Sequence, residues 1–122
     1  MYIRALQGKE EALGPGHTST FRTVNKLGKL YKAQGKLAKA EAMYNRALQG
    51  KEEALGPDHI STLDTVNNLG KLYTDQGKLV EAEALYVRAL QGKEEALGPD
   101  HTSTLDTVNN LGKLYKAQGK LA

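Results

Sequence analysis

The chain has 122 residues, a net charge of +3 and a hydrophobic share of 39%. No apolar stretch is long enough to span a bilayer, and the first residues do not have the pattern of a secretory signal. Cysteine is absent from the sequence, which excludes disulfides and thiolate metal sites. We therefore expect a cytoplasmic protein that does not associate with membranes.

A unit of 42 residues is repeated along the whole sequence. The copies are residues 1–42, 43–84 and 85–122, and the third is four residues short. Copies one and two differ at 10 of 42 positions, and copies two and three differ at 6 of the 38 positions that they share. A period of this length predicts units that stack on one another and form their core between neighbours. We therefore interpret residues 1–122 as a single repeat array.

Each unit contributes two predicted helices, joined as an antiparallel hairpin. The chain begins in the second helix of one unit and ends where another second helix would begin, so we expect a fragment of a longer array. In chain order, the expected elements are a lone helix at about 1–13, hairpins at about 19–55 and 61–97, and a lone helix at about 103–118.

The middle copy shows the pattern of the first helix most clearly. Val66, Leu69 and Leu72 recur at helical spacing. Ser61 is the expected N-cap, and Asp64 three residues later completes a capping-box-like pair. Ser103 and Asp106 repeat this pair in the third copy, whereas the first copy has Arg22 at the Asp64 position.

Glycines mark the ends of the predicted helices and the places of closest packing. Gly77 is expected to end the first helix, because glycine adopts the left-handed conformation without a Cβ clash. The second helix should begin near Lys78 and end at Gly98, which precedes a proline. Gly70 and Gly92 lie inside helices at a cost of about 1 kcal/mol each, which favours close helix approach. The expected apolar stripe of the second helix is Leu79, Ala82, Tyr86, Ala89, Leu90 and Leu97.

These residues fall at the spacing of a known family. The middle copy has Val66, Leu69, Gly70, Tyr73, Gly77, Ala82, Tyr86 and Ala89, and the preceding copy has Val24, Leu27, Gly28, Tyr31, Gly35, Ala40, Tyr44 and Ala47. The pattern resembles the tetratricopeptide repeat, in a 42-residue variety similar to kinesin light chains and fungal immune-receptor-like arrays. The usual repeat has about 34 residues and a closing proline; here Glu94 takes that place. The resemblance implies an all-α fold, an α-solenoid of antiparallel hairpins wound into a right-handed superhelix.

The polar residues give no sign of an enzyme or of a metal or cofactor site. His17, His59 and His101 are a full repeat apart, so we expect a role in the loop or at a helix start. The six tyrosines occupy core motif positions, where packing is expected rather than base stacking. The copies scarcely vary, which argues against reading of a nucleic acid sequence.

Two further patterns predict a binding surface. The family's first helices line a concave face, where matching asparagines hold an extended peptide. An Asn amide can pair with the N–H and C=O of a peptide together, and lysines one turn away suit acidic side chains. A polar, solvated helix face is the alternative interpretation. The expected peptide-binding residues are Asn25, Lys29, Asn67, Asn68, Lys71, Asn109, Asn110 and Lys113.

The charge distribution and the terminal helices separate two hypotheses. The net charge is +5 for copy one, −3 for copy two and +1 for copy three, which favours a groove that accepts an acidic peptide near the first hairpin. The near-identity of the copies favours a structural array that binds itself end to end, as a rod or a swapped dimer. The expected self-association residues are Leu6, Leu13, Val108, Leu111 and Tyr115.

Overall fold

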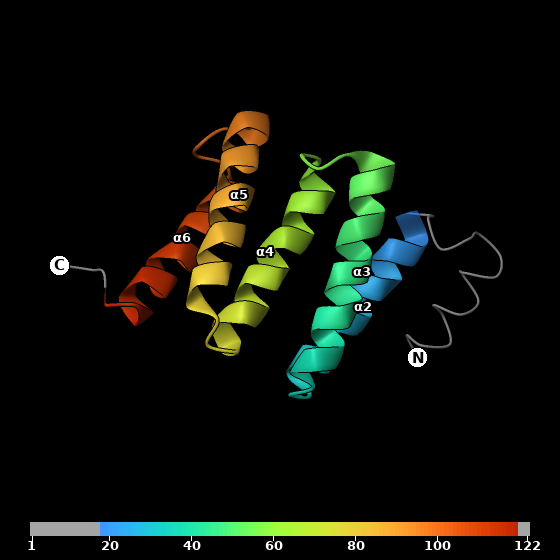
Figure 1. Cartoon of the computed structure of the whole chain (residues 1–122). Coiled ribbons are helices and arrows are strands. Elements are labelled where there is room, and N and C mark those ends of the chain that lie inside the picture. Colours follow the sequence, from blue (N-terminus) through green and yellow to red (C-terminus); the bar gives the residue numbers. More distant parts are fainter. Residues whose placement is uncertain (1–17, 120–122) are drawn as a thin grey trace. The chain divides into compact units, whose positions relative to one another are not determined.

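The computed structural model describes residues 18–119, with side chains from Thr23 onward. Every regular element in this range is a helix, and consecutive helices run in opposite directions (Figure 1). The all-α fold of helical hairpins is therefore confirmed, while the helix expected at 1–13 lies outside the described residues. The helices are α2 (Thr18–Ala33), α3 (Leu37–Leu55), α4 (Ile60–Asp75), α5 (Leu79–Leu97) and α6 (Thr102–Ala117).

The chain divides into two compact units. The first unit runs to Thr65 and the second begins at Val66, so the boundary falls within α4. None of the described helices is both long and apolar enough to cross a membrane.

In the first unit, α2 and α3 pack along their lengths. Val24, Leu27 and Ala47 form the buried centre of this contact. Gly28 is what allows the helices to approach, because a Cβ at this position would lie 2.9 Å from Cε1 of Tyr44. Tyr44 is 1% exposed, and burial raises the pKa of its hydroxyl to about 12.

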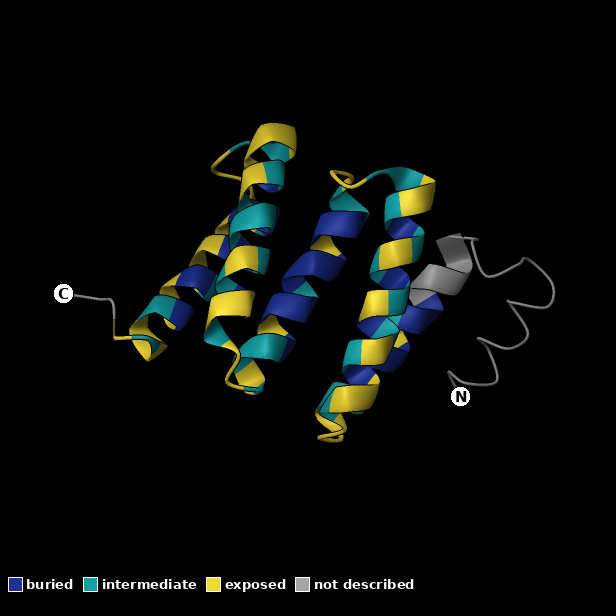
Figure 2. Ribbon diagram, viewed as in Figure 1, coloured by how far each residue is buried: buried dark blue, intermediate teal, exposed yellow. Residues whose placement is uncertain are grey.

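The second unit repeats this arrangement. A Cβ at Gly70 would lie 2.6 Å from Cε1 of Tyr86, which confirms the predicted close approach of helices at this glycine. Burial likewise raises the pKa of Tyr86. Between α5 and α6, a buried cluster contains Ala82, Tyr86, Leu111 and Leu114. In Figure 2 the buried positions recur at intervals along α3 and α5, among exposed ones.

The predicted glycine turns are confirmed. Gly77 has a φ of 77° and Gly98 a φ of 92°, in the region that L-residues with a Cβ rarely adopt. At the first of these turns the N–H of Lys78 donates to the carbonyl of Tyr73 at 2.8 Å. This bond spans five residues and is the one that closes a Schellman motif. Helix α5 then starts at Leu79, as the sequence predicts.

The predicted serine N-caps are wrong, and the histidines take that role. His59 Nδ1 accepts a hydrogen bond from the N–H of Ser61 at 3.1 Å, and His101 Nδ1 accepts one from Ser103 at the same distance. The cap residue of α6 is therefore His101. Each helix starts earlier than predicted, because the imidazole nitrogen reaches the amide two residues on and satisfies a donor of the first turn. The helix-entry role expected for these two histidines is confirmed.

Candidate functional site

Three lysines occupy one repeat position in α2, α4 and α6. Lys29, Lys71 and Lys113 are all exposed. The position follows the buried pair Leu27 and Gly28 in α2, and its equivalents in the other two copies. The apolar residues that follow in each helix lie on the face toward the core. The lysine lies on a different face and is directed to solvent. Each of these helices thus presents a cation in its C-terminal half.

The asparagines predicted to contact a peptide have different surroundings. Asn25, Asn68 and Asn110 are half-buried, and Asn109 is exposed. Asn67 is buried, with 7% of its surface exposed. Asn67 and Asn109 are both in the second unit and occupy the same position of the repeat, but Asn67 is buried and Asn109 is exposed.

Asn67 joins two helices of the second unit. Its Oδ1 accepts a hydrogen bond from Oγ1 of Thr107 at 3.3 Å and another from Nδ2 of Asn110 at 3.2 Å. The acceptor that a peptide N–H would use is thus engaged by α6. These bonds connect residues 40 and 43 positions apart, and the sequence alone did not indicate them.

Two buried lysines form a second set of contacts between helices. Lys93, at 2% exposure, donates from Nζ to Oγ1 of Thr107 at 3.1 Å and to the carbonyl of Ser103 at 3.4 Å. Lys51 makes the same pair of bonds in the first unit, to Thr65 at 2.9 Å and Ser61 at 3.2 Å.

The burial of these two lysines was not predicted from the sequence, although a signal was present. Lys93 lies four residues after Ala89 and seven after Tyr86. It therefore continues the apolar stripe of α5. A lysine on that stripe must find a polar partner inside the protein, and the hydroxyl of Thr107 is one.

The residues expected to mediate self-association are only in part exposed. Val108 is 46% exposed and Leu111 is 6% exposed. Leu111 packs in the cluster with Ala82 and Tyr86, so it belongs to the contact between α5 and α6 and is not displayed as expected. Leu6 and Leu13 lie outside the described residues.

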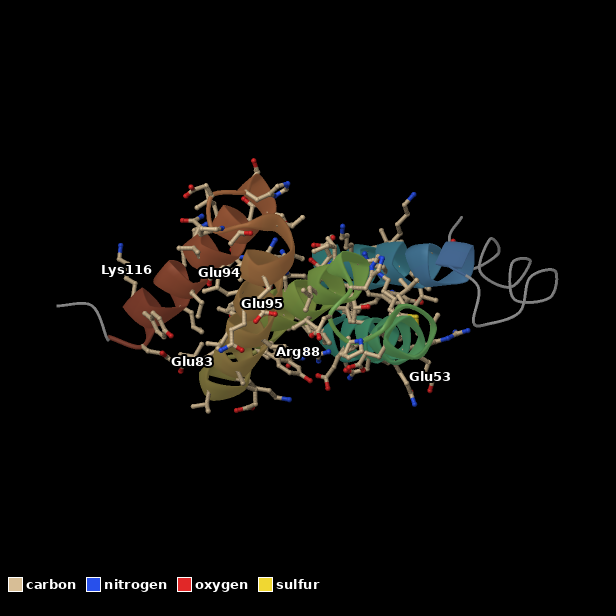
Figure 3. All side chains as sticks on the ribbon, turned by 90° about the horizontal axis from the view of Figure 1, so that it is seen from above. Glu53, Glu83, Arg88, Glu94, Glu95 and Lys116 are labelled. Carbon is tan, nitrogen blue, oxygen red and sulfur yellow. The ribbon has the colours of Figure 1, made fainter. Side chains whose placement is uncertain are left out.

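Tyr115, the remaining residue of this set, is half-buried. Its hydroxyl donates to Oε2 of Glu83 at 3.0 Å. Glu83, labelled in Figure 3, belongs to α5, and its hydrogen bond raises the pKa of Tyr115. Within the described residues, no three His, Cys, Asp or Glu side chains are grouped so as to hold a metal ion.

Comparisons with known proteins agree with this geometry. A family model described as Tetratricopeptide repeat matches residues 1–53, 25–95 and 61–122. No curated protein matches the sequence. The crystal structure of BtubC (BKLC) from P. vanneervenii superposes with a TM-score of 0.89 at 26% identity, over 98% of this chain and 48% of that one.

A second solved structure contains the nearly identical TPR-like repeats of a putative kinesin light chain from Podosopora anserina. It has a TM-score of 0.88 at 22% identity, over 98% of this chain and 56% of that one. At this identity the likeness shows the fold alone. The chain spans about half the length of the solved structures it matches.

The matches to the family model overlap and together reach from the first residue to the last. The described hairpins, with a glycine packed against a tyrosine ring in each unit, have the arrangement that the resemblance implies. Repeats of this kind generally mediate protein–protein interaction or scaffolding and are generally non-catalytic. The chain belongs to the tetratricopeptide repeat family.

Proposed function

We propose that this chain is a non-catalytic protein-interaction module that holds an extended, acidic peptide or partner segment. The observation that carries the proposal is the repeated exposure of one lysine per first helix, at Lys29, Lys71 and Lys113. The absence of cysteine from the sequence supports a cytoplasmic location as part of the proposal.

Amides accompany these cations in the second unit. Asn68 precedes Lys71 by three residues, and Asn110 precedes Lys113 by three. Residues at this spacing are neighbours on a helix surface. An amide that pairs with a peptide backbone and a lysine that pairs with a carboxylate would then act side by side. Asn67 takes a different role in this scheme, because its Oδ1 holds α6.

The charges indicate where an acidic segment would bind most strongly. In α2, Lys26 and Lys29 are both exposed. In α4 the residue equivalent to Lys26 is Asn68, so the cation density is lower. We expect the acidic end of a peptide to contact α2, with an affinity that falls as salt is raised, because exposed charges are screened.

Fluorescence anisotropy with labelled acidic, neutral and basic peptides of equal length tests this function. Lys29→Glu should weaken binding of the acidic peptides about tenfold, by about 1.4 kcal/mol, and Lys113→Glu should weaken it less. Lys36→Glu changes the charge equally at the exposed residue that precedes α3 and serves as the control. Equal binding of acidic and basic peptides would refute the electrostatic part of the proposal.

Self-association of the repeat array is the second candidate function. It is supported by two large apolar residues of α6, Leu105 and Val108, which are 49% and 46% exposed. Exposed apolar surface of this kind is typical of interfaces. Leu6, Leu13 and Tyr115 remain predicted participants. Solution mass measured by light scattering over a range of concentrations tests this function, and a constant monomeric mass would exclude it.

A further inference from the structure

The same six residues occur in α4 and α6 with different exposure. The sequence Leu-Asp-Thr-Val-Asn-Asn spans 63–68 in α4 and 105–110 in α6. Leu63 and Val66 are fully buried, whereas Leu105 and Val108 are about half exposed. Because the side chains are identical, α6 presents to solvent a surface that α4 keeps buried.

The hydrogen bonds to Asn67 show which side chains pack against this surface of α4. Its Oδ1 receives a hydroxyl donor from Thr107 and an amide donor from Asn110, both on α6. Asn109 is the equivalent of Asn67 one repeat later and is exposed. The helix that fits next to α6 should therefore carry a hydroxyl and a second donor three residues apart.

Helix α2 carries such a pair. In the 42-residue register, Thr23 is equivalent to Thr107 and Lys26 to Asn110. Thr23 is buried, but Lys26 is exposed, and its ammonium group can donate where Asn110 donates an amide. The cation makes the hydrogen bond to an amide oxygen stronger than a neutral donor would.

We propose that α6 of one copy of this chain docks on α2 of a second copy, with Lys26 donating to Oδ1 of Asn109 and with Leu105 and Val108 buried in the contact. The proposal rests on the second candidate function above and names its interface. The two surfaces differ, so the contact is heterologous and leaves an unused α2 and an unused α6 at the two ends of each dimer. Such a contact continues into longer assemblies unless it closes into a ring.

The proposal is tested in the full chain by two variants, Val108→Glu on the α6 surface and Lys26→Glu on the α2 surface. Val108→Glu introduces a charge into the apolar part of the α6 surface and should raise the dissociation constant for self-association about a hundredfold or more. Val80→Glu makes the same substitution at a valine of α5 that is 74% exposed and should leave the constant unchanged. Sedimentation velocity over a range of concentrations gives the constants.

Lys26→Glu replaces the donor on α2 by an acceptor and should raise the dissociation constant about tenfold or more. Lys26→Asn is its matched control, because it restores the residue that α4 and α6 have at this position, and association should persist. An equimolar mixture of Val108→Glu and Lys26→Glu retains one intact α6 and one intact α2 surface. We therefore expect the mixture to form a 1:1 dimer at concentrations where each variant alone is monomeric.

The outcomes are distinguishable. A wild-type chain that stays monomeric at all concentrations would overturn both the interface and self-association itself. A wild-type assembly that neither variant weakens would leave self-association standing and overturn the interface. If Val108→Glu dissociates the assembly but Lys26→Glu does not, α6 pairs with another surface, and the assignment of α2 is wrong.

Discussion

Helices α4 and α6 have the same residues at most of their positions, but they share only part of their contacts. Each begins at a histidine cap and receives a buried lysine from the helix before it, Lys51 for α4 and Lys93 for α6. They differ where α4 meets the next first helix: Asn67 is engaged there, whereas Asn109 is exposed. The position of a residue in the 42-residue repeat thus determines its contacts inside its own hairpin, and the neighbouring repeat determines its other contacts.

The largest expected effect compares the leucines at the start of the shared segment. Leu63→Ala removes a fully buried side chain and should lower the free energy of unfolding by about 2–5 kcal/mol. Leu105→Ala, at 49% exposure, should lower it by less than about 1 kcal/mol. Urea denaturation followed by circular dichroism, at a concentration where the chain is monomeric, measures both. Equal losses would show that the two helices are equally covered in solution.

The fold could be predicted from the sequence because the repeat period, the glycine turns and the apolar spacing all indicate the same hairpin. Gly77 and Lys78 were placed correctly, since a glycine with positive φ has few alternatives to a helix end. The starts of the helices were not predicted correctly. Serine is the commoner cap, and the rule gave no weight to His59, whose ring nitrogen reaches the same region of the first turn.

The candidate site was predictable only in part. Exposure of Lys29, Lys71 and Lys113 follows from helical periodicity, and it was expected. The burial of Lys93 was missed because a lysine near a run of glutamates suggests a solvated face. The bonds to Asn67 depend on which residues of α6 lie opposite it. Periodicity within one helix carries no information about that register.

A second pair of substitutions tests the close approach of helices. Gly70 and Gly112 occupy the same repeat position, but a Cβ at Gly70 would meet the ring of Tyr86, and one at Gly112 would meet nothing within 4 Å. Gly70→Ala should therefore destabilise the chain by about 1–3 kcal/mol. Gly112→Ala should stabilise it by up to about 1 kcal/mol through helix propensity. Thermal unfolding by circular dichroism compares the two, and a gain at both sites would contradict the packing of Tyr86 against α4.

A third pair separates the two asparagines. Asn67→Leu removes the acceptor for Thr107 and Asn110. It should cost about 1–2 kcal/mol of stability, because the buried hydroxyl of Thr107 and the half-buried amide of Asn110 both lose their acceptor. Asn109→Leu should change the stability of the monomer by no more than about 0.5 kcal/mol. Chemical denaturation of both variants at low concentration measures the difference. A loss at Asn109 equal to that at Asn67 would mean that the exposed amide has a structural partner in the monomer.

The smallest expected effect concerns the histidine caps, at which α4 and α6 should not differ. His59→Ala and His101→Ala each remove the side-chain acceptor for the N–H of a serine in the first turn, and the loss of such a cap costs about 1 kcal/mol. Because both caps are formed within their own loop, the neighbouring unit should not change the cost. Stability measured by urea denaturation should therefore fall by similar amounts, and amide exchange should rise locally at Ser61 and at Ser103. A clearly larger loss at one histidine would show that its cap also depends on contacts beyond the loop. The division between contacts inside a hairpin and contacts with the next repeat would then be too simple.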